Sequence, residues 1–292
     1  MKNIFFYLVL FSSLFTDAQT QQNINKNSGT VSNIITTIDS IRFTGSSSNM
    51  EVVLQNGTIE SHSISDIINV NFAASLSQHS CGVDSVHNPN LTYGNMTDQE
   101  GNVYKTIVIG NQEWMAENLN TTIYRNGDPI TNMLPSKEWT NTSITQLGTW
   151  VSYDNDSQYD CPYGKIYNWY VVSDPRQVCP TGWHVPTNDE WTTLVDYLGG
   201  PEVAGGKMKS TSLNYWLYTN QDASNESGFS SLGCGYIYGQ LFNFYGWNAM
   251  LWSSTEYDTY FAYHLELNWS WGFSYQIPSD KVDGYSIRCV KD

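Results

Sequence analysis

All 11 tryptophans of this 292-residue chain lie between Trp114 and Trp271. A buried aromatic side chain removes on the order of 150–250 Å² from solvent, so this segment can build a large core. The composition changes near residue 96, where a stretch rich in Ser, His and Asn ends. We therefore expect a main domain over residues 96–292, preceded by a linker over residues 74–95.

The first 18 residues show the three-part pattern of a secretory signal peptide. Lys2 gives a positive start, an apolar run extends from Ile4 to Phe15, and Thr16-Asp17-Ala18 offers small residues at the usual cleavage spacing. The apolar run is shorter than the roughly 20 residues that a membrane-spanning helix needs. We expect a secreted or cell-surface protein that begins near Gln19 and has no transmembrane segment.

A small β unit is expected over residues 36–73. Alternating apolar residues at 50–54 precede Asn56-Gly57, and this combination is a strong hairpin signal. Similar alternation on both sides of the hairpin predicts four strands, which are too few for a substantial core. The Gln-, Asn- and Ser-rich residues 19–35 before this unit are expected to form a disordered start.

The chain is acidic, with 13 Lys and Arg against 28 Asp and Glu and a formal net charge of -15. This charge repels phosphate backbones and anionic lipids, so we expect no nucleic-acid partner. Charged residues make up 14% of the chain and aromatic residues also 14%, so the surface is polar mainly through Asn, Ser, Thr and Tyr. Such a surface suits an extracellular protein that faces carbohydrate, and equally any loop-rich secreted protein.

The cysteines form no Cys-x-x-Cys pair, and their spacings fit no zinc pattern. In an oxidising compartment some of them should form disulfides, and an odd number leaves at least one thiol free or paired between chains. The five positions are Cys81, Cys161, Cys179, Cys234 and Cys289.

One helix is clearly predicted in the main domain. Thr187 and Glu190 have the spacing of a capping box. Apolar residues follow on one face at helical spacing until Gly199-Gly200 ends the helix. Short aromatic strands are expected later, at residues 235–239, 249–254, 261–269 and 285–290. The pattern predicts an α+β domain with few helices and much loop.

Five motifs in the main domain occur in a characteristic order. They are 110–119 (GNQEWMAENL), 163–170 (YGKIYNWY), 179–191 (CPTGWHVPTNDEW), 252–256 (WSSTE) and 285–290 (YSIRCV). Together they resemble the Fibrobacter succinogenes major paralogous domain, found in exported bacterial proteins, over residues 98–291. Residues 36–73 are similar to a short repeat that often precedes such domains. The family's biochemical role is poorly defined, so the resemblance implies a fold and a location more than an activity.

The resemblance implies a C-type-lectin-like fold of the branch that includes the sulfatase-modifying factors. Such a fold is a loop-rich α+β unit whose termini come together. It brings the segment before the capped helix close to the last strand, which implies a disulfide between Cys179 and Cys289. Many members have a cysteine where this chain has Glu113. This difference would leave Cys81 without a partner.

The sequence gives little support for an enzyme. Formylglycine-generating relatives hold copper through two thiols. Cys234 is the only cysteine between residues 180 and 288, so a Cys179–Cys289 disulfide would leave no adjacent thiol pair. No G-x-S-x-G motif is present. The domain's two histidines, His184 and His264, are too few for a histidine-based metal site, and His184 is expected to be a packed structural residue. A carboxylate pair for glycoside hydrolysis stays open, because its separation is a spatial quantity. We expect no cofactor.

Asp154, Asp156 and Asp160 form an acidic loop whose alternating oxygens would suit calcium. The Gly and Glu of an EF-hand are missing, and so is the Glu-Pro-Asn or Gln-Pro-Asp motif of calcium-binding lectins. Most acidic loops of this kind are simply solvated. We therefore expect no bound metal.

Aromatic residues in the last third of the chain are the candidate ligand site, because sugars stack their apolar faces on such rings. The bland alternative is that these rings are core, as most aromatics at alternating strand positions are. Trp269 and Trp271 would share one face if they lay on one strand. The candidates are Trp247, Trp252, Tyr257, Tyr260, Trp269 and Trp271.

The leading hypothesis is a secreted or cell-surface binding or adhesion protein without catalytic activity. Its partner would be a neutral extended ligand such as a glycan, or a surface protein. One alternative is an enzyme with a dispersed site that acts on polysaccharide. Another is a structural surface protein with the β unit as a spacer. A deep pocket lined by titratable groups would favour the enzyme, and a shallow aromatic groove would favour the binder.

Overall fold

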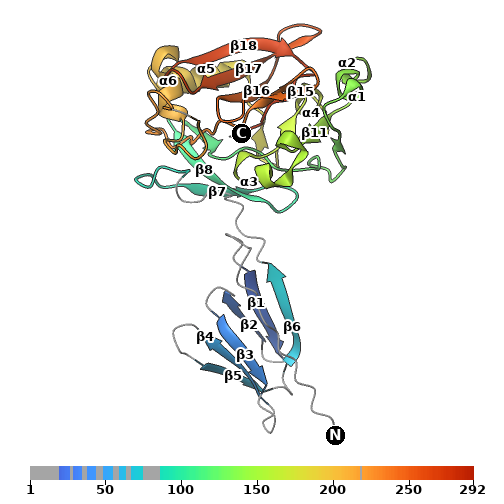
Figure 1. Ribbon diagram of the computed structural model, residues 1–292, viewed down its shortest axis with the longest axis vertical. Helices are drawn as coiled ribbons and strands as arrows, with labels where there is room; N and C mark the ends of the chain where they lie inside the picture. Colours follow the sequence, from blue (N-terminus) through green and yellow to red (C-terminus); the bar gives the residue numbers. More distant parts are fainter. Residues whose placement is uncertain are drawn as a thin grey trace. The chain divides into compact units, whose positions relative to one another are not determined.

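The protein is described here by a computed structural model (Figure 1). It divides into two compact units at residue 77. The predicted signal peptide (residues 1–18) and Cys81 lie outside the described residues. The described part contains no helix that is long and apolar enough to cross a membrane. The described residues are 20–26, 29–34, 38–43, 49–54, 59–63, 67–74, 86–217 and 219–292.

The first unit consists of two antiparallel three-stranded sheets. One has the order β2-β1-β6 and the other β3-β4-β5. Strands β4 and β5 pair with Met50 opposite His62, so the predicted hairpin around Asn56-Gly57 is confirmed. The strands are β1 (Thr20–Lys26), β2 (Gly29–Ile34), β3 (Ile38–Phe43), β4 (Asn49–Leu54), β5 (Ile59–Ser63) and β6 (Ile67–Ala74).

The first unit differs from the expectation in two respects. Residues 19–35, expected to be disordered, contain strands β1 and β2. The four expected strands belong to two sheets, because β6 pairs with β1 rather than with β5. Ile24 in β1 lies opposite both Val31 and Val70. Backbone pairing with a strand on each side gives this polar segment an order that its composition alone did not predict.

The second unit contains a five-stranded sheet that joins the two ends of the domain. Its order is β13-β19-β9-β8-β7. The last strand, β19, lies between β13 and β9, so the termini come together as the resemblance implied. The strands are β7 (Gly94–Thr97), β8 (Val103–Ile109), β9 (Gln112–Met115), β13 (Trp183–His184) and β19 (Val290–Lys291).

A second sheet of the domain has the order β16-β17-β18 and carries core residues on both faces. Leu251 lies opposite Leu265, and both belong to a cluster with the helical residue Trp191. On the other face Trp252 lies opposite His264 and packs with Tyr285. The strands are β16 (Asn248–Glu256), β17 (Phe261–Asn268) and β18 (Ser274–Asp280).

The predicted capped helix is confirmed as α5 (Asn188–Tyr197). The Glu190 amide donates to Thr187 Oγ1 over 3.2 Å, and the Thr187 amide donates to Glu190 Oε2 over 2.8 Å. These bonds satisfy amides that no helical carbonyl reaches. Helix α6 (Pro201–Met208) follows and packs on β18.

The remaining elements are short and joined by long loops, so the domain is a β-rich α+β structure with few helices. Predicted strands 235–239, 249–254 and 261–269 correspond to β14, β16 and β17. The strand predicted at 285–290 is shorter, because regular pairing there begins only at Val290. The short elements are β10 (Thr131–Asn132), α1 (Lys137–Thr140), α2 (Thr142–Thr145), β11 (Thr149–Val151), η3 (Tyr153–Asn155), η4 (Ser157–Tyr159), α3 (Asp160–Tyr163), β12 (Ile166–Tyr167), α4 (Trp169–Val172), β14 (Tyr236–Tyr238) and β15 (Leu241–Asn243).

The Cys179–Cys289 disulfide is confirmed, with the two Cα atoms 6.1 Å apart. It joins the loop before α5 to the residue before β19, inside the cluster that contains Trp252. Cys234 is a buried free thiol.

Candidate ligand-binding site

The structure brings together only two of the predicted site residues, Trp247 and Trp269. Both are half-buried, and their rings meet edge to face with centroids 5.8 Å apart. Trp252 is wholly buried and its indole nitrogen donates to the Tyr167 carbonyl over 2.8 Å. Trp252 is therefore a core residue, which corrects its prediction as a ligand residue. Its place on the inner face of β16 is what buries it.

The other predicted residues are dispersed. Trp269 and Trp271 lie between β17 and β18 rather than on one strand, so they do not share a strand face. Trp271 meets Tyr275 edge to face at 6.2 Å. Tyr257 and Tyr260 are exposed in the turn between β16 and β17. These four residues do not form one platform.

A hollow lies elsewhere in the domain, and four of its eight lining residues are tyrosines. Its volume is about 340 Å³, near the small end of the range typical of ligand sites. We call it the tyrosine hollow. Its lining residues are Asp156, Gln158, Tyr159, Cys161, Tyr163, Asn214, Tyr215 and Tyr245.

Three separate loop regions supply these residues. The first is the segment 153–163, which contains η3, η4 and α3, and it includes the acidic loop considered above for calcium. Asp156 accepts the Gln158 amide through Oδ1 over 2.9 Å and so caps η4. Tyr215 follows α6, and Tyr245 lies between β15 and β16. The hollow exists only when all three regions are folded together.

The rings around the hollow pack in edge-to-face and tilted contacts centred on Tyr245. Its centroid is 5.3 Å from that of Tyr153, 5.1 Å from that of Tyr159 and 5.1 Å from that of Tyr163. The Tyr245 hydroxyl donates to the Tyr163 hydroxyl over 2.8 Å. Such contacts fix ring orientations, so the hollow is pre-formed rather than assembled on binding.

Gly235 makes this close packing possible. It has a φ of +67°, and a side chain at this position would meet the Tyr153 ring at 2.7 Å. Glycine adopts this backbone conformation without the strain that other residues incur. The glycine thus lets Tyr153 approach the loop that carries Tyr245.

Three phenols of the ring cluster are neutral at physiological pH. Burial raises the pKa of Tyr163, of Tyr245 and of Tyr153. The phenols therefore keep their protons and can donate as well as accept hydrogen bonds. No Lys or Arg lines the hollow within the described residues. A ligand would meet aromatic carbon, hydroxyls, two amide side chains and one carboxylate.

The acidic loop does not assemble a metal site in the described part of the chain. Asp160 forms an ion pair with Lys165 over 2.6 Å. No group of three or more His, Cys, Asp or Glu residues in the described ranges is arranged to hold a metal ion. Asp156 instead contributes its carboxylate to the rim of the tyrosine hollow.

A second hollow, of about 170 Å³, lies beside the disulfide and is lined by Arg125, Cys179 and His184 among others. The Arg125 guanidinium donates to the carbonyls of Cys179, Pro180 and Trp183 over 2.7–2.9 Å. The guanidinium of Arg125 therefore already has its partners within the protein. We interpret this hollow as structural.

His184 differs from the expectation of a packed structural residue. Its side chain is 34% exposed and bridges two carboxylates. Nδ1 lies 2.7 Å from Asp292 Oδ1, and Nε2 lies 2.8 Å from Glu190 Oε1. This cluster ties the end of the chain to the cap of α5. His184 therefore has a structural role that depends on its charge rather than on apolar packing.

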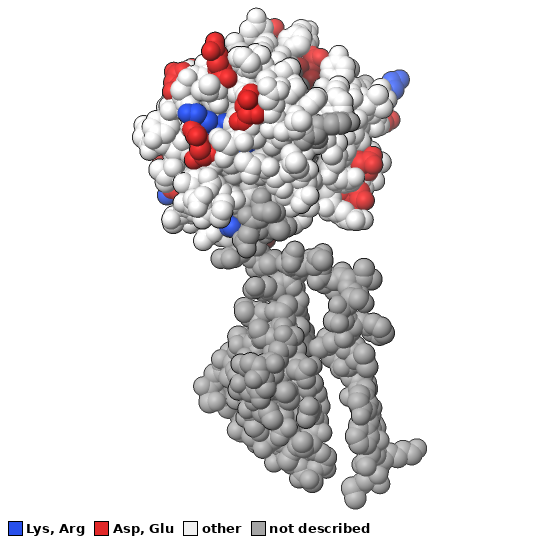
Figure 2. Space-filling model, turned by 60° about the vertical axis from the view of Figure 1, so that its left-hand side comes forward, with Lys and Arg blue, Asp and Glu red and all other residues white. Residues whose placement is uncertain are grey.

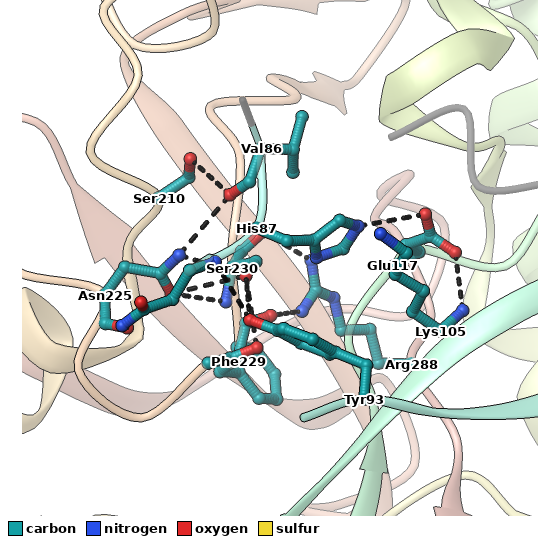
Figure 3. Close-up of polar contacts among 12 residues, drawn as sticks. Val86, His87, Tyr93, Lys105, Glu117, Ser210, Asn225, Phe229, Ser230 and Arg288 are labelled. Carbon is teal, nitrogen blue, oxygen red and sulfur yellow. Dashed lines mark hydrogen bonds and ion pairs between the residues drawn. The ribbon is translucent and has the colours of Figure 1, made fainter. Parts of the chain in front are cut away.

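A buried polar network, shown in Figure 3, connects residues 86–93 to the rest of the domain. His87 Nε2 lies 3.2 Å from Glu117 Oε1, and both side chains are buried. The Ser210 hydroxyl and the Asn225 amide both donate to the Val86 carbonyl. The second half of the expected linker at 74–95 is therefore part of the domain. The polar composition of this segment is typical of a linker. Its polar groups find their partners only in the folded state, because those partners are distant in the sequence.

Arg288 crosses the same region and is also buried (Figure 3). Its guanidinium donates to the Phe229 and Ser230 carbonyls and to Asn118 Oδ1. Burial lowers the pKa of Arg288 to about 9. Because Arg288 is buried and these partners are all groups of the protein, we interpret the network as one that holds loops together.

A comparison with protein families matches residues 107–291 to the Fibrobacter succinogenes major domain. The chain belongs to this family. The match contains every tyrosine of the hollow. Residues 86–106 lie outside the match, although they include buried residues of the same folded domain. No curated protein and no solved structure matched the chain.

Sequence reasoning missed the tyrosines of the hollow. Two signals pointed toward it: the acidic loop at 154–160, considered only for calcium, and Tyr163, which begins one of the family motifs. The remaining rings come from distant loops that no sequence spacing relates. Of the predicted residues, Trp252 belongs to the core and most of the others are dispersed over the domain.

Proposed function

We propose that this protein is an extracellular binding or adhesion protein whose tyrosine hollow holds part of a glycan, and that it catalyses no reaction. The observation that carries the proposal is the ring cluster around Tyr245, which leaves a pre-formed hollow of about 340 Å³. Aromatic walls with a few polar groups are the usual lining of a small-molecule site. Hydroxyl and amide groups on the rim match the hydroxyls of a sugar.

The electrostatics also suit such a partner. The chain carries a net charge of -15, and acidic side chains are scattered over the face shown in Figure 2. This charge disfavours anionic partners such as nucleic acid or sulfated glycans. A ligand recognised through neutral phenols and amides needs no cation on the protein.

The scaffold and the location are parts of the same proposal. We propose a C-type-lectin-like arrangement, supported by the place of β19 between β13 and β9 and by the Cys179–Cys289 disulfide. We propose export on the pattern of residues 1–18. N-terminal sequencing of native protein should find a start near Gln19, and an intact Met1 would contradict export.

The enzymatic alternative needs a reachable acid. Burial and the charge of Asp280 raise the pKa of Asp283 to about 7, a value that would suit a general acid. Asp283 is only 3% exposed and lies against Tyr285, outside the tyrosine hollow. It therefore lacks the access to substrate that catalysis requires.

A glycan array probed with the full mature chain tests the proposal. We expect binding to one class of glycan, followed by loss of that binding in Tyr215→Ala. The matched control is Tyr197→Ala, which removes an exposed tyrosine of α5 outside the hollow. Absence of binding to every glycan, or release of reducing ends from a bound polysaccharide, would contradict it.

A further inference from the structure

The rim of the tyrosine hollow carries negative charge that no Lys or Arg of the described residues pairs with. Asp156 lines the hollow, and Asp154 lies exposed two residues before it. Neither carboxylate forms an ion pair within the described residues. The nearby Lys165 is engaged elsewhere, with its ammonium 2.6 Å from Asp160 and 4.6 Å from the Trp150 ring centroid.

Elsewhere in the domain, several Lys and Arg side chains lie over aromatic rings. The Arg176 guanidinium lies 4.0 Å above the Tyr124 ring, and the Lys281 ammonium lies 4.6 Å above the Trp169 ring. An aromatic face attracts a cation because its π electrons give it partial negative charge. In the described part of the chain, no Lys or Arg lies over a ring of the tyrosine hollow. The hollow is thus an aromatic cluster with an acidic rim and no internal cation.

We infer that the cation comes with the ligand: the tyrosine hollow binds a sugar that carries an ammonium group, a deacetylated amino sugar of the glucosamine type. This inference rests on the proposed glycan-binding function. The ammonium is attracted both by the neutral phenol rings and by the Asp156 carboxylate. The sugar hydroxyls meet the Asn214 and Gln158 amides on the rim. An N-acetylated or plain hexose offers the same ring without the charge.

Three trisaccharides with the same β-1,4 linkage separate charge from shape: glucosamine, N-acetylglucosamine and glucose. Titration of the full mature chain by calorimetry should show the glucosamine trisaccharide bound about fivefold more tightly than the other two, the upper end of the range for a solvent-exposed ion pair. That advantage should shrink as salt is raised from about 0.01 to 1 M, because the Debye length falls from about 30 to 3 Å.

Asp156→Asn tests the carboxylate without removing the cap of η4, because the asparagine oxygen can still accept the Gln158 amide. It should lower the affinity for the glucosamine trisaccharide about fivefold and leave the other two unchanged. Asp196→Asn on α5 makes the same charge change outside the hollow, and should have no effect.

The outcomes distinguish the two proposals. Equal binding of the three trisaccharides, unaffected by Asp156→Asn, would overturn the ammonium inference and leave glycan binding standing. No binding of any trisaccharide or arrayed glycan would overturn both. Choline should bind more weakly than the glucosamine trisaccharide. Choline binding as tight as the trisaccharide would mean that ammonium alone is recognised, and would overturn the assignment to a sugar.

Discussion

Three core tryptophans and three tyrosines of the hollow are placed in contrasting ways. Trp139, Trp216 and Trp252 are fully buried, and their indole nitrogens donate to backbone carbonyls over 2.6–2.8 Å. Tyr159, Tyr215 and Tyr245 are only partly buried and border the tyrosine hollow. An indole has one donor that a single carbonyl satisfies, whereas a phenol hydroxyl both donates and accepts and is readily left at a wet edge.

This difference separates stability from recognition. Trp216 and Trp252 belong to large clusters that join both sheets to the helices, so each of them supports much of the domain, whereas Trp139 belongs to a smaller separate cluster. Among the hollow tyrosines, Tyr163 is a buried member of one such cluster, whereas Tyr159, Tyr215 and Tyr245 are partly buried and pack against it. Changes in the first set should mainly lower stability, and changes in the second set should mainly lower ligand binding.

The largest expected effect comes from the disulfide inside the Trp252 cluster. Replacing both Cys179 and Cys289 by serine removes a cross-link between residues separated by 110 positions. The chain-entropy model predicts a loss of up to about 4–5 kcal/mol in the free energy of unfolding. Urea denaturation measures this loss. Cys234→Ala, which removes a buried thiol but no cross-link, should cost far less, and an equal cost would contradict the account.

Trp252→Ala should lower the free energy of unfolding by about 3–5 kcal/mol, because it leaves a large cavity in the core. Trp247→Ala removes the same side chain from a half-buried position and should cost less than half as much. Chemical denaturation of the two variants makes a direct comparison. Similar losses would show that burial does not separate the two tryptophans as described.

Thr187→Ala should lower the free energy of unfolding by roughly 1 kcal/mol. The Glu190 amide donates to Thr187 Oγ1 at the start of α5 and would lose this partner. Thr193→Ala is the control within the same helix, since Thr193 is exposed and its hydroxyl bonds only to the Asp189 carbonyl. The control should be neutral or slightly stabilising. A denaturation midpoint unchanged in Thr187→Ala would contradict the role of the cap.

The smallest effect concerns His184. Burial opposes its charged form, but hydrogen bonds to Asp292 and Glu190 outweigh this and raise its pKa above the usual value. The ion pairs therefore contribute fully below the unfolded pKa of about 6.5 and are lost as pH rises through the higher folded pKa. The stability difference between the wild type and His184→Gln should be larger at about pH 6 than at about pH 8.5. Melting temperatures across this range measure it, and a constant difference would contradict the assignment.

Local features of the fold were predictable from sequence, whereas assembled ones were not. The helix after Thr187 and the hairpin around Asn56-Gly57 depend on neighbours in the chain, and both were predicted correctly. The Cys179–Cys289 disulfide followed only from family resemblance, because its partners are distant in sequence. The network of His87 and Glu117 was missed, since polar residues that pair only on folding look like a linker.

The candidate site shows the same limit. Alternation along a strand places aromatic residues on one face of a sheet, but it does not show whether that face is covered. Both faces of the sheet that contains Trp252 are covered by core residues. The tyrosine hollow draws on three loops whose approach depends on Gly235 and on tertiary packing. The acidic loop was identified, but its neighbours in space, Tyr215 and Tyr245, were not.

The most direct test combines stability and binding in one variant of the hollow, Tyr159→Ala with Tyr215→Ala. Calorimetry should show at least a tenfold loss of affinity for the bound glycan, equivalent to about 1.4 kcal/mol. The unfolding midpoint should stay close to that of Tyr197→Ala, the exposed control. Unchanged glycan affinity, or a loss of affinity that only follows unfolding of the domain, would contradict the division between a tryptophan core and a tyrosine binding site.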